Sequence, residues 1–293
     1  MSRKVVFYFL LFLFTLFLFS SFYYFKKPSA QLQVTFLDVG QGDSILIETP
    51  YEQNILIDGG PDDRVLAGLG RNLPFWDRSM DLALLTHPHS DHVAGLAETQ
   101  GKYALDRALY TGVGYNSSIY RSWEQMINNP DTEVRVLTGP QTVDLGDDCY
   151  LRTLYPFGSL KDEKVEEMNN TSVVSKLKCR GASFLFPGDI EEKVKKKLVD
   201  SEVDLDAQVL KASHHGAGEN ISGRFVEEVS PEVVVVSVGE NDHGHPNESY
   251  LRDLEEKGIK VLRTDKKGDI IFTKNKTESS IEFGGHDWKD ILY

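Results

Sequence analysis

Residues 85–95 form the segment of this chain with the most metal-ligand chemistry. Their sequence, L-T-H-P-H-S-D-H-V-A-G, places His87, His89, Asp91 and His92 within six residues. Imidazole and carboxylate groups together suit Zn²⁺, Mn²⁺ or Fe. In an extended loop, His87 and His89 project to the same side, as alternate residues do. We expect Asp91 and His92 to form a turn that leads into a helix and to serve a second metal position. The alternative is a polar loop whose histidines are hydrogen-bonded within the protein.

Other ligand-type residues also follow predicted strands. The apolar run 80–86 is short and bounded by polar residues, which is typical of a buried strand that ends where the histidine loop begins. Asp58 and Asp189 lie just after two further predicted strands, and seven of the eight histidines fall in three such loops. Because loops at strand ends build the active sites of α/β sheets, we expect these groups to converge.

Short β runs alternate with helices along the chain. The first three runs, 33–37, 44–48 and 54–57, flank glycine-rich turns and predict a meander. Further strands are expected over 135–137, 149–155, 172–179, 184–186, 207–212, 232–238, 260–263 and 269–273. Helices are expected over 93–100, 118–127, 191–198, 224–229 and 250–257. The pattern predicts one α/β (α+β) domain over residues 31–283, with helices outside a mixed sheet, and a peripheral tail over 284–293.

The N-terminal segment, residues 1–30, is predicted to be a membrane anchor with a short linker. Residues 5–25 contain no charge and are long enough to cross a bilayer. A cleaved signal peptide is the competing interpretation, but the apolar run is longer than a usual signal core, and Pro28 fits a cleavage site poorly. Basic residues flank the run almost equally, with a slight excess on the N-terminal side. This excess favours an extracytoplasmic domain.

The rest of the chain is strongly acidic. Without the first 30 residues, which hold four Lys and Arg and no Asp or Glu, 28 basic residues remain against 45 acidic ones, a formal charge of −17. Such a field repels polyanions at long range, which argues against a tight, nonspecific nucleic-acid binder. It does not exclude cleavage of a polyanion at a metal ion, because the ion supplies local positive charge.

The two cysteines lie in neighbouring β-like runs. If these runs pair with Tyr155 opposite Val173, then Cys149 lies opposite Cys179. A disulfide can form if the domain is outside the cytosol, but two buried free thiols are at least as well favoured. Neither cysteine has a second cysteine nearby, so neither is a predicted metal ligand.

Several motifs together resemble the metallo-β-lactamase superfamily. They are L-I-D-G-G at 56–60, T-H-P-H-S-D-H at 86–92 and P-G-D at 187–189. Others resemble the metallohydrolase domain of the ComEC competence proteins: F-L-D-V-G-Q-G-D-S at 36–44, L-K-A-S-H-H-G at 210–216, S-V-G at 237–239, G-H-P at 244–246 and R-T-D-K-K-G at 263–268. The resemblance covers about residues 31–275.

This resemblance implies a four-layer αβ/βα sandwich with one or two divalent ions, Zn or Mn, along one edge of the two sheets. It implies that His87 and His89 ligate the first ion. Asp91, His92 and a late histidine would ligate the second ion, and Asp189 would bridge the two. His245 is the first choice for the late histidine, and His214 or His215 is the rival.

Further roles follow from the same resemblance. Asp91 and Asp189 would hold the attacking water, and His215 would steady the leaving group. Asp58 would orient a ligand or its loop. The candidate substrate-binding residues are Gln41, Asp43, Lys211 and Asn170, although Asp43 is equally a candidate cap of its own turn.

One expected ligand is missing. Members of the superfamily with two full sites have a third histidine for the first ion before the bridging aspartate, but this chain has no histidine between His92 and His214. Near the expected place it has L-Y-P at 154–156, followed by N-N-T-S at 169–172. The first site is therefore expected to be weak, vacant until substrate binds, or completed by water or Asp38.

The leading hypothesis is a metal-dependent phosphodiesterase or nuclease that acts on DNA at the cell surface, as in DNA uptake. The ion would generate the attacking hydroxide from water near neutral pH. The implied partners are the membrane, DNA and a separate membrane channel, because one span cannot conduct DNA by itself. The alternatives are a hydrolase of a small or envelope-linked ester, phosphoester or lactone, which the acidity favours, and a noncatalytic DNA- or partner-binding module, which the complete histidine motif disfavours.

Overall fold

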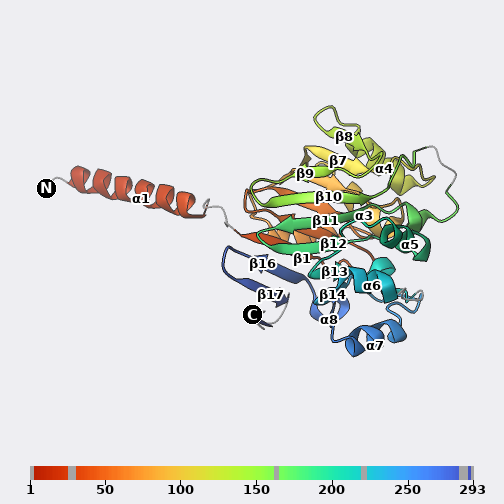
Figure 1. Ribbon diagram of the computed structural model, residues 1–293. Helices are drawn as coiled ribbons and strands as arrows, with labels where there is room; N and C mark the ends of the chain where they lie inside the picture. Colours follow the sequence, from red (N-terminus) through yellow and green to blue (C-terminus); the bar gives the residue numbers. More distant parts are fainter. Residues whose placement is uncertain (1–2, 26–30, 162–164, 219–222, 284–289, 292–293) are drawn as a thin grey trace.

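Two β-sheets lie face to face in this computed structural model, and helices cover the outer face of each (Figure 1). The structure describes residues 3–25, 31–161, 165–218, 223–283 and 290–291. Side chains of both sheets meet in one apolar core, with Phe36 and Ile47 from one sheet and Leu177 and Phe186 from the other. The expected four-layer sandwich is therefore the observed fold.

The first sheet has nine strands in the order β18-β17-β16-β1-β2-β3-β5-β7-β8. Its strands are β1 (Leu32–Phe36), β2 (Ile45–Glu48), β3 (Asn54–Ile57), β5 (Leu82–Leu84), β7 (Arg107–Tyr110), β8 (Glu133–Val136), β16 (Ile270–Lys274), β17 (Ser279–Phe283) and β18 (Asp290–Ile291). Neighbours from β18 to β3 pair antiparallel, and those from β3 to β8 pair parallel. The predicted meander is confirmed to within one residue at each strand end.

The second sheet has seven strands in the order β15-β14-β13-β12-β11-β10-β9. They are β9 (Thr142–Asp144), β10 (Cys149–Tyr155), β11 (Val174–Cys179), β12 (Ala182–Phe186), β13 (Val209–Lys211), β14 (Val233–Val236) and β15 (Lys260–Arg263). β12 to β15 are parallel and β9 to β12 are antiparallel. The all-valine strand β14 is buried along its whole length, as expected for a strand covered on both faces.

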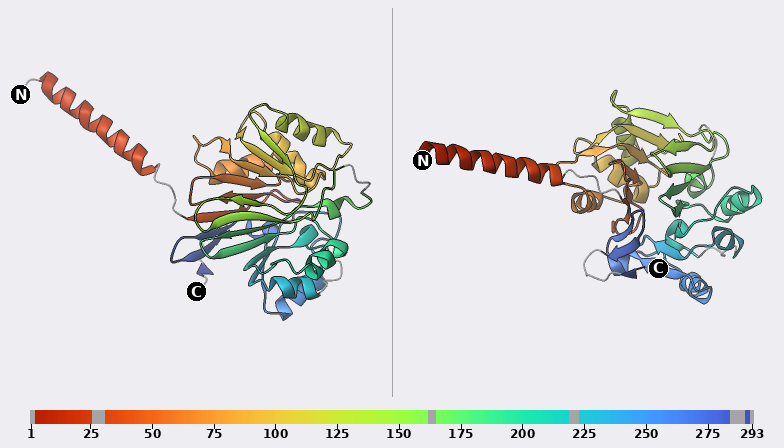
Figure 2. Two further views of the ribbon diagram at one scale, coloured as in Figure 1. Left: turned by 45° about the horizontal axis from the view of Figure 1, so that its top comes forward. Right: turned by 60° about the vertical axis from the view of Figure 1, so that its left-hand side comes forward.

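Helices pack on the outer faces through apolar residues three or four positions apart, the spacing that places them on one helix face. The first sheet is covered by α2 (Arg64–Asn72), α3 (Ser90–Glu98) and α4 (Ser118–Ile127). The second is covered by α5 (Glu192–Asp200), α6 (Gly223–Val229) and α7 (Glu248–Glu256). The short elements are β4 (Ser79–Met80), β6 (Ala104–Leu105), η1 (Met168–Thr171), η2 (Ser213–Gly216) and α8 (Thr264–Lys267). Figure 2 shows the two helical layers on opposite sides of the sheets.

Three sequence predictions differ from the observed elements. The run 80–86 is not one strand, because β4 and β5 pair with different partners on either side of Asp81. Helix α3 begins at Ser90, three residues before the predicted start, so that Asp91 lies in its first turn. The tail is not wholly peripheral: β18 pairs with β17 as the outermost strand of the sheet, while residues 284–289 and 292–293 lie outside the described residues.

The N-terminal helix α1 (Arg3–Phe25) stands apart from the sandwich (Figure 1). Its residues 3–20 have a mean hydropathy of 1.8, and none of this window is buried inside the protein. The helix is long and apolar enough to cross a membrane, which is what the sequence predicted. The predicted linker, 26–30, lies outside the described residues.

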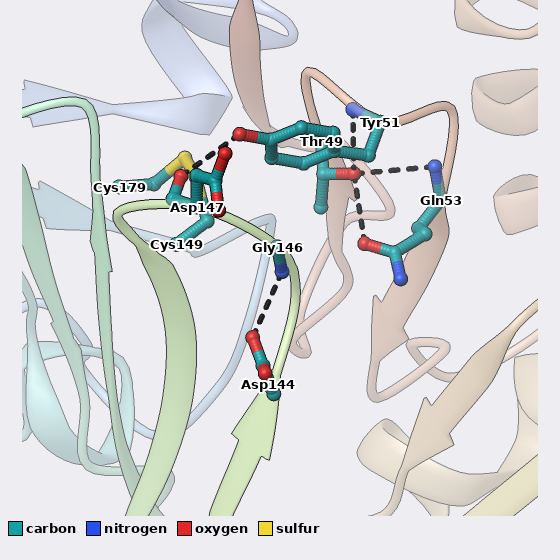
Figure 3. The surroundings of a disulfide bond; sticks show 8 residues. All are labelled: Thr49, Tyr51, Gln53, Asp144, Gly146, Asp147, Cys149 and Cys179. Carbon is teal, nitrogen blue, oxygen red and sulfur yellow. Dashed lines mark hydrogen bonds between the residues drawn. A yellow bond between two sulfur atoms is a disulfide. The ribbon is translucent and has the colours of Figure 1, made fainter.

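The two cysteines form a disulfide between β10 and β11 (Figure 3). Cys149 lies opposite Cys179 as predicted, but Tyr155 pairs with Val174 rather than Val173, because an irregularity after Thr153 shifts the register. The Tyr51 hydroxyl donates to the carbonyl of Asp147 at 2.9 Å and so ties the β2–β3 turn of the first sheet to this end of the second.

Removing this disulfide should lower the free energy of unfolding by about 3–4 kcal/mol, the loop-closure entropy for a crosslink between residues of this separation. The two cysteines are 30 residues apart. The measurement is urea unfolding of the full chain in detergent, comparing the oxidised protein with C149S/C179S. The reduced wild-type protein should unfold at the same urea concentration as the double variant. An unchanged midpoint in both would contradict the prediction.

Candidate metal centre

The candidate ligands meet at one edge of the sandwich, where strands of both sheets end. In the first sheet, Asp58 follows β3 and His87 follows β5, and these two strands are parallel. In the second sheet, Asp189 follows β12 and His215 follows β13, which are also parallel. The loops of each sheet therefore leave in a common direction, and contacts of Asp189 with His92 join the two sets.

Four side chains converge on one point: Asp91, His92, Asp189 and His215. The Nε2 atom of His92 lies 3.2 Å from Oδ2 of Asp189 and 3.8 Å from Oδ2 of Asp91. The Nε2 atom of His215 lies 3.3 Å from each of the same two oxygens. Ligands of a tetrahedral Zn²⁺ at 2.0–2.1 Å are separated by about 3.4 Å. The four atoms thus already have nearly the spacing of a four-coordinate site.

The chemistry of this donor set also fits a cation. The His215 Nε2 atom is buried and has no hydrogen-bond partner among the described residues. An unpartnered buried nitrogen is costly unless another group satisfies it. Two carboxylates and two imidazoles are the ligands that Zn²⁺ and Mn²⁺ accept. The residues present therefore fit a divalent metal ion.

Asp58 fixes the orientation of His92 from behind. Its Oδ2 atom lies 2.8 Å from Nδ1 of His92, and the carboxylate also accepts from the backbone N–H and hydroxyl of Thr86 at 2.8 and 2.7 Å. A carboxylate on one ring nitrogen selects the tautomer that leaves the other nitrogen free as a ligand. Asp58 is thus placed where the sequence predicted an orienting residue, and that role remains a prediction.

His215 is turned toward the cluster by an uncommon backbone conformation. Both His214 and His215 have positive φ, 49° and 53°, inside η2. Residues other than glycine rarely adopt this region, and it costs on the order of 1 kcal/mol or more for each residue. The Nδ1 atom of His215 lies 2.9 Å from the carbonyl oxygen of Ser237, so Nε2 points at the two aspartates. Strained residues of this kind cluster at functional sites.

A buried ion pair lies directly behind these ligands. The side chains of Lys211 and Asp43 are 1% and 2% exposed and form a salt bridge. The Lys211 ammonium also donates to Oδ1 of Asp189 and to the carbonyl of Gly188, both at 3.2 Å. Lys211 therefore binds one oxygen of Asp189 while the other oxygen faces the histidines.

Burial and the neighbouring charges shift the pKa values of the cluster in opposite directions, and the charges have the larger effect. Burial acts to lower the pKa of His215, but Asp189 and Asp43 outweigh it and raise that pKa to about 9. The pKa of His92 is likewise raised against burial by Asp189 and Asp58. Burial acts to raise the pKa of Asp189, but the cations His215, Lys211 and His92 hold it well below its usual range. The same field that stabilises protons on the two imidazoles would stabilise a divalent cation.

The expected first metal position is less complete. The Nε2 atom of His87 lies 3.1 Å from Nδ1 of His89, and burial lowers the pKa of both imidazoles, which leaves them neutral and able to ligate. Asn169, near the place where the missing histidine was expected, acts to raise the pKa of His89. Its side-chain amide donates to Oε1 of Glu191 at 3.0 Å and lies 3.4 Å from Nε2 of His214. Asn170, a predicted substrate-binding residue, donates from its side-chain amide to Glu191 and Glu167, and its role stays a prediction.

The structure places His215, rather than the first choice His245, beside Asp91 and Asp189, and the assignment of the late ligand stays a prediction. The His245 ring instead packs edge-on against His214, with ring centroids 5.1 Å apart. Burial and the neighbouring His214 lower the pKa of His245 to about 4. His214 and His215 are adjacent in the sequence, and their left-handed backbone conformation determines that the ring of His215 faces the two aspartates.

Three other candidates are placed away from the four ligands or behind them. Asp38 accepts from the backbone N–H of Gly40 at 3.3 Å and so caps its own loop. Gln41 accepts from the backbone N–H of Gly239 and joins two loops. Asp43, a candidate for substrate binding, is buried on Lys211 instead. The sequence does mark one member of this pair, because Lys211 is the charged residue of the otherwise apolar strand β13.

Comparison with known proteins gives one family. The model of the metallo-beta-lactamase superfamily matches residues 37–261. ComE operon protein 3 of Bacillus subtilis (strain 168) is 27% identical over 284 residues, covering 90% of this chain and 36% of that protein. The competence protein ComA of Neisseria gonorrhoeae is 30% identical over 253 residues, covering 84% and 33%. The chain thus spans about a third of the length of these relatives.

Solved structures share the fold. Zn²⁺-bound PqqB from Methylobacterium extorquens superposes with a TM-score of 0.52 at 14% identity, covering 80% of this chain and 87% of that one. YhfI from Bacillus subtilis, described as a metallo-beta-lactamase fold protein, gives 0.50 at 15% identity, covering 83% and 99%. Identities this low establish the architecture alone.

Proposed function

Because this chain belongs to the metallo-beta-lactamase superfamily, we propose that it is a metal-dependent hydrolase that cleaves phosphodiester bonds of DNA at the cell surface. The observation that carries the proposal is the convergence of Asp91, His92, Asp189 and His215. These four residues would hold one Zn or Mn ion. His87 and His89, with Asn169 beside them, would hold a second ion less firmly.

The protein's own residues divide the remaining tasks. A divalent ion, when bound, supplies Lewis-acid chemistry and makes water nucleophilic near neutral pH. Asp58 holds the His92 ring, and Lys211 holds Asp189. The Asp91 side chain is 31% exposed, whereas those of His92, Asp189 and His215 are buried. Asp91 is therefore the member of the set that solvent and substrate reach, and we assign to it the proton of the attacking water.

DNA as the substrate is supported by the two competence relatives. The acidic surface opposes polyanion binding, so recognition would depend on positive charge within the metal centre rather than on a basic groove. For the same reason a small or envelope-linked ester, phosphoester or lactone is the second candidate substrate. A role in uptake would require a separate membrane channel as a partner.

The location follows from two features. Helix α1 is long and apolar enough to serve as a membrane anchor, and the disulfide between Cys149 and Cys179 favours an oxidising compartment. We therefore place the domain on the extracytoplasmic side of the membrane.

The test is cleavage of labelled single-stranded DNA by the full chain in detergent, with metal content measured in parallel. Removing the ion with a chelator should abolish cleavage, and returning Zn²⁺ or Mn²⁺ should restore it. Asp91→Ala should lower the rate by at least about 10²-fold, since a ligand and proton acceptor are both lost. Glu98→Ala, an exposed carboxylate on the same helix, is the matched control. Turnover of simple esters or lactones without DNA cleavage would select the second substrate class. A protein that binds no ion and stays inert after Zn²⁺ or Mn²⁺ is added would contradict hydrolysis.

A further inference from the structure

We propose that residues 74–77, the aromatic turn, insert Phe75 and Trp76 into the headgroup region of the membrane that α1 spans. These are among the most exposed large apolar side chains of the sandwich, at 79% and 51%. Their rings contact each other edge to face, with centroids 4.8 Å apart. Large aromatic side chains left in water in this way indicate a surface that another phase or molecule covers.

The aromatic turn is a defined structure. The backbone N–H of Asp77 donates to the carbonyl of Pro74 at 2.9 Å, which closes a four-residue turn with the two aromatic residues at its centre. Asp77 then accepts from the side-chain amide of Asn54 at 2.9 Å, and this contact fixes the turn to the first residue of β3. The turn therefore presents both rings from a fixed base.

The register of the first sheet places this base at the end where the chain arrives from α1. Asn54 pairs with Glu48 at the end of β2, and Glu48 pairs with Gln33 at the start of β1. Two strand spacings separate β1 from β3, about 10 Å. Only six residue steps lead from Phe25, the end of α1, to Gln31, and such a segment spans at most about 22 Å. The aromatic turn thus lies on the side of the domain nearest the anchor.

The chemistry of the turn favours a lipid surface over a protein partner. Tryptophan is enriched at membrane interfaces because its ring is apolar and its N–H is polar. The guanidinium groups of the flanking Arg71 and Arg78 are held by Asp269 and by the Tyr103 hydroxyl, so the two aromatic rings are the groups of this segment that the turn leaves to the solvent. The anchor itself keeps the turn within reach of a bilayer.

Insertion of the aromatic turn would determine which way the metal centre faces relative to the membrane. The candidate ligands lie at the opposite ends of the same strands, and Gln33 to Asp38 alone extends about 17 Å. The domain would therefore stand on the membrane with its metal centre facing away from the bilayer. This inference depends on α1 crossing the membrane and not on the reaction, so it can fail while the hydrolase proposal holds.

The experiment measures the depth of Trp76 in the full chain reconstituted into phosphatidylcholine vesicles. The emission lost in Trp76→Phe is that of Trp76, and it is compared in ordinary lipid and in lipid brominated near the headgroup. We expect bromine to reduce this emission at least twofold. Phe75→Ser should weaken the quenching, whereas Phe157→Ser, an exposed aromatic residue at the metal-centre end, should not.

Two results would overturn the inference. Emission unaffected by brominated lipid but quenched by aqueous iodide would show that Trp76 remains in water. Emission protected from both quenchers would show that protein covers the turn, either a second copy of this chain or another partner.

Discussion

His215→Gln should remove the ion from the metal centre and lower the rate of hydrolysis by more than about 100-fold, while His245→Gln should leave both nearly unchanged. Removing a residue that only orients a metal ligand already costs 10–100-fold in affinity or activity, and His215 is placed to ligate directly. Its Nε2 atom lies 3.3 Å from Asp91 and from Asp189. His245 packs on His214 instead, outside the four-residue cluster.

The comparison is made by metal analysis of the two purified variants and by rates measured at saturating Zn²⁺ or Mn²⁺. Glutamine keeps a polar side chain of similar size, so both variants should fold. Whichever of the two variants loses more of its bound metal identifies the histidine that ligates the ion. If His245→Gln loses the ion and His215→Gln keeps it, then His245 moves into the cluster when metal binds, and the arrangement described above is wrong.

Lys211→Met should cost about 3–5 kcal/mol of stability, the penalty for breaking a buried ion pair from one side. The substitution leaves Asp43 without its cation in a site closed to water. It also removes the donor to Oδ1 of Asp189, so the affinity for the ion should fall by about 10–100-fold. Unfolding in urea and metal titration of the same variant measure the two effects.

Two further variants separate charge from packing. In K211M/D43N the uncompensated carboxylate is gone, so much of the lost stability should return while the weaker metal binding remains. Lys176→Met is the matched control, because Lys176 is buried like Lys211 but pairs with the exposed Asp204, whose carboxylate can be hydrated. Equal losses in Lys211→Met and Lys176→Met would show that the buried pair has no special role.

The local parts of the centre were predictable from sequence. The histidine motif, the aspartates after β3 and β12 and the meander all depend on short-range pattern, and the structure has them where they were expected. The disulfide register was predictable too, because strand pairing fixes which residues face each other. The predictions that differ from the structure depended on backbone conformation over one or two residues.

Two examples show why. His214 and His215 are adjacent, and only their left-handed backbone angles decide which imidazole faces the aspartates. Asn169 and Asn170 lie in the same 3₁₀ turn, η1, and both amides donate to Glu191, but only the amide of Asn169 also lies near His214. No periodicity in the sequence distinguishes such neighbours. The sequence marked Lys211 as a charge at the end of an apolar strand, β13, but did not identify Asp43 as its partner, because the two residues are far apart in the chain.

The disulfide has a consequence for the integrity of the molecule. The crosslink joins the first residue of β10 to the last residue of β11, so it encloses both strands and the segment between them, which carries Asn169. If a peptide bond within this loop were hydrolysed, the two resulting fragments would remain joined by the disulfide. The fragment that carries His92 would stay attached to the fragment that carries Asp189 and His215, so a cut by a protease at this place would not by itself separate the two halves of the metal centre.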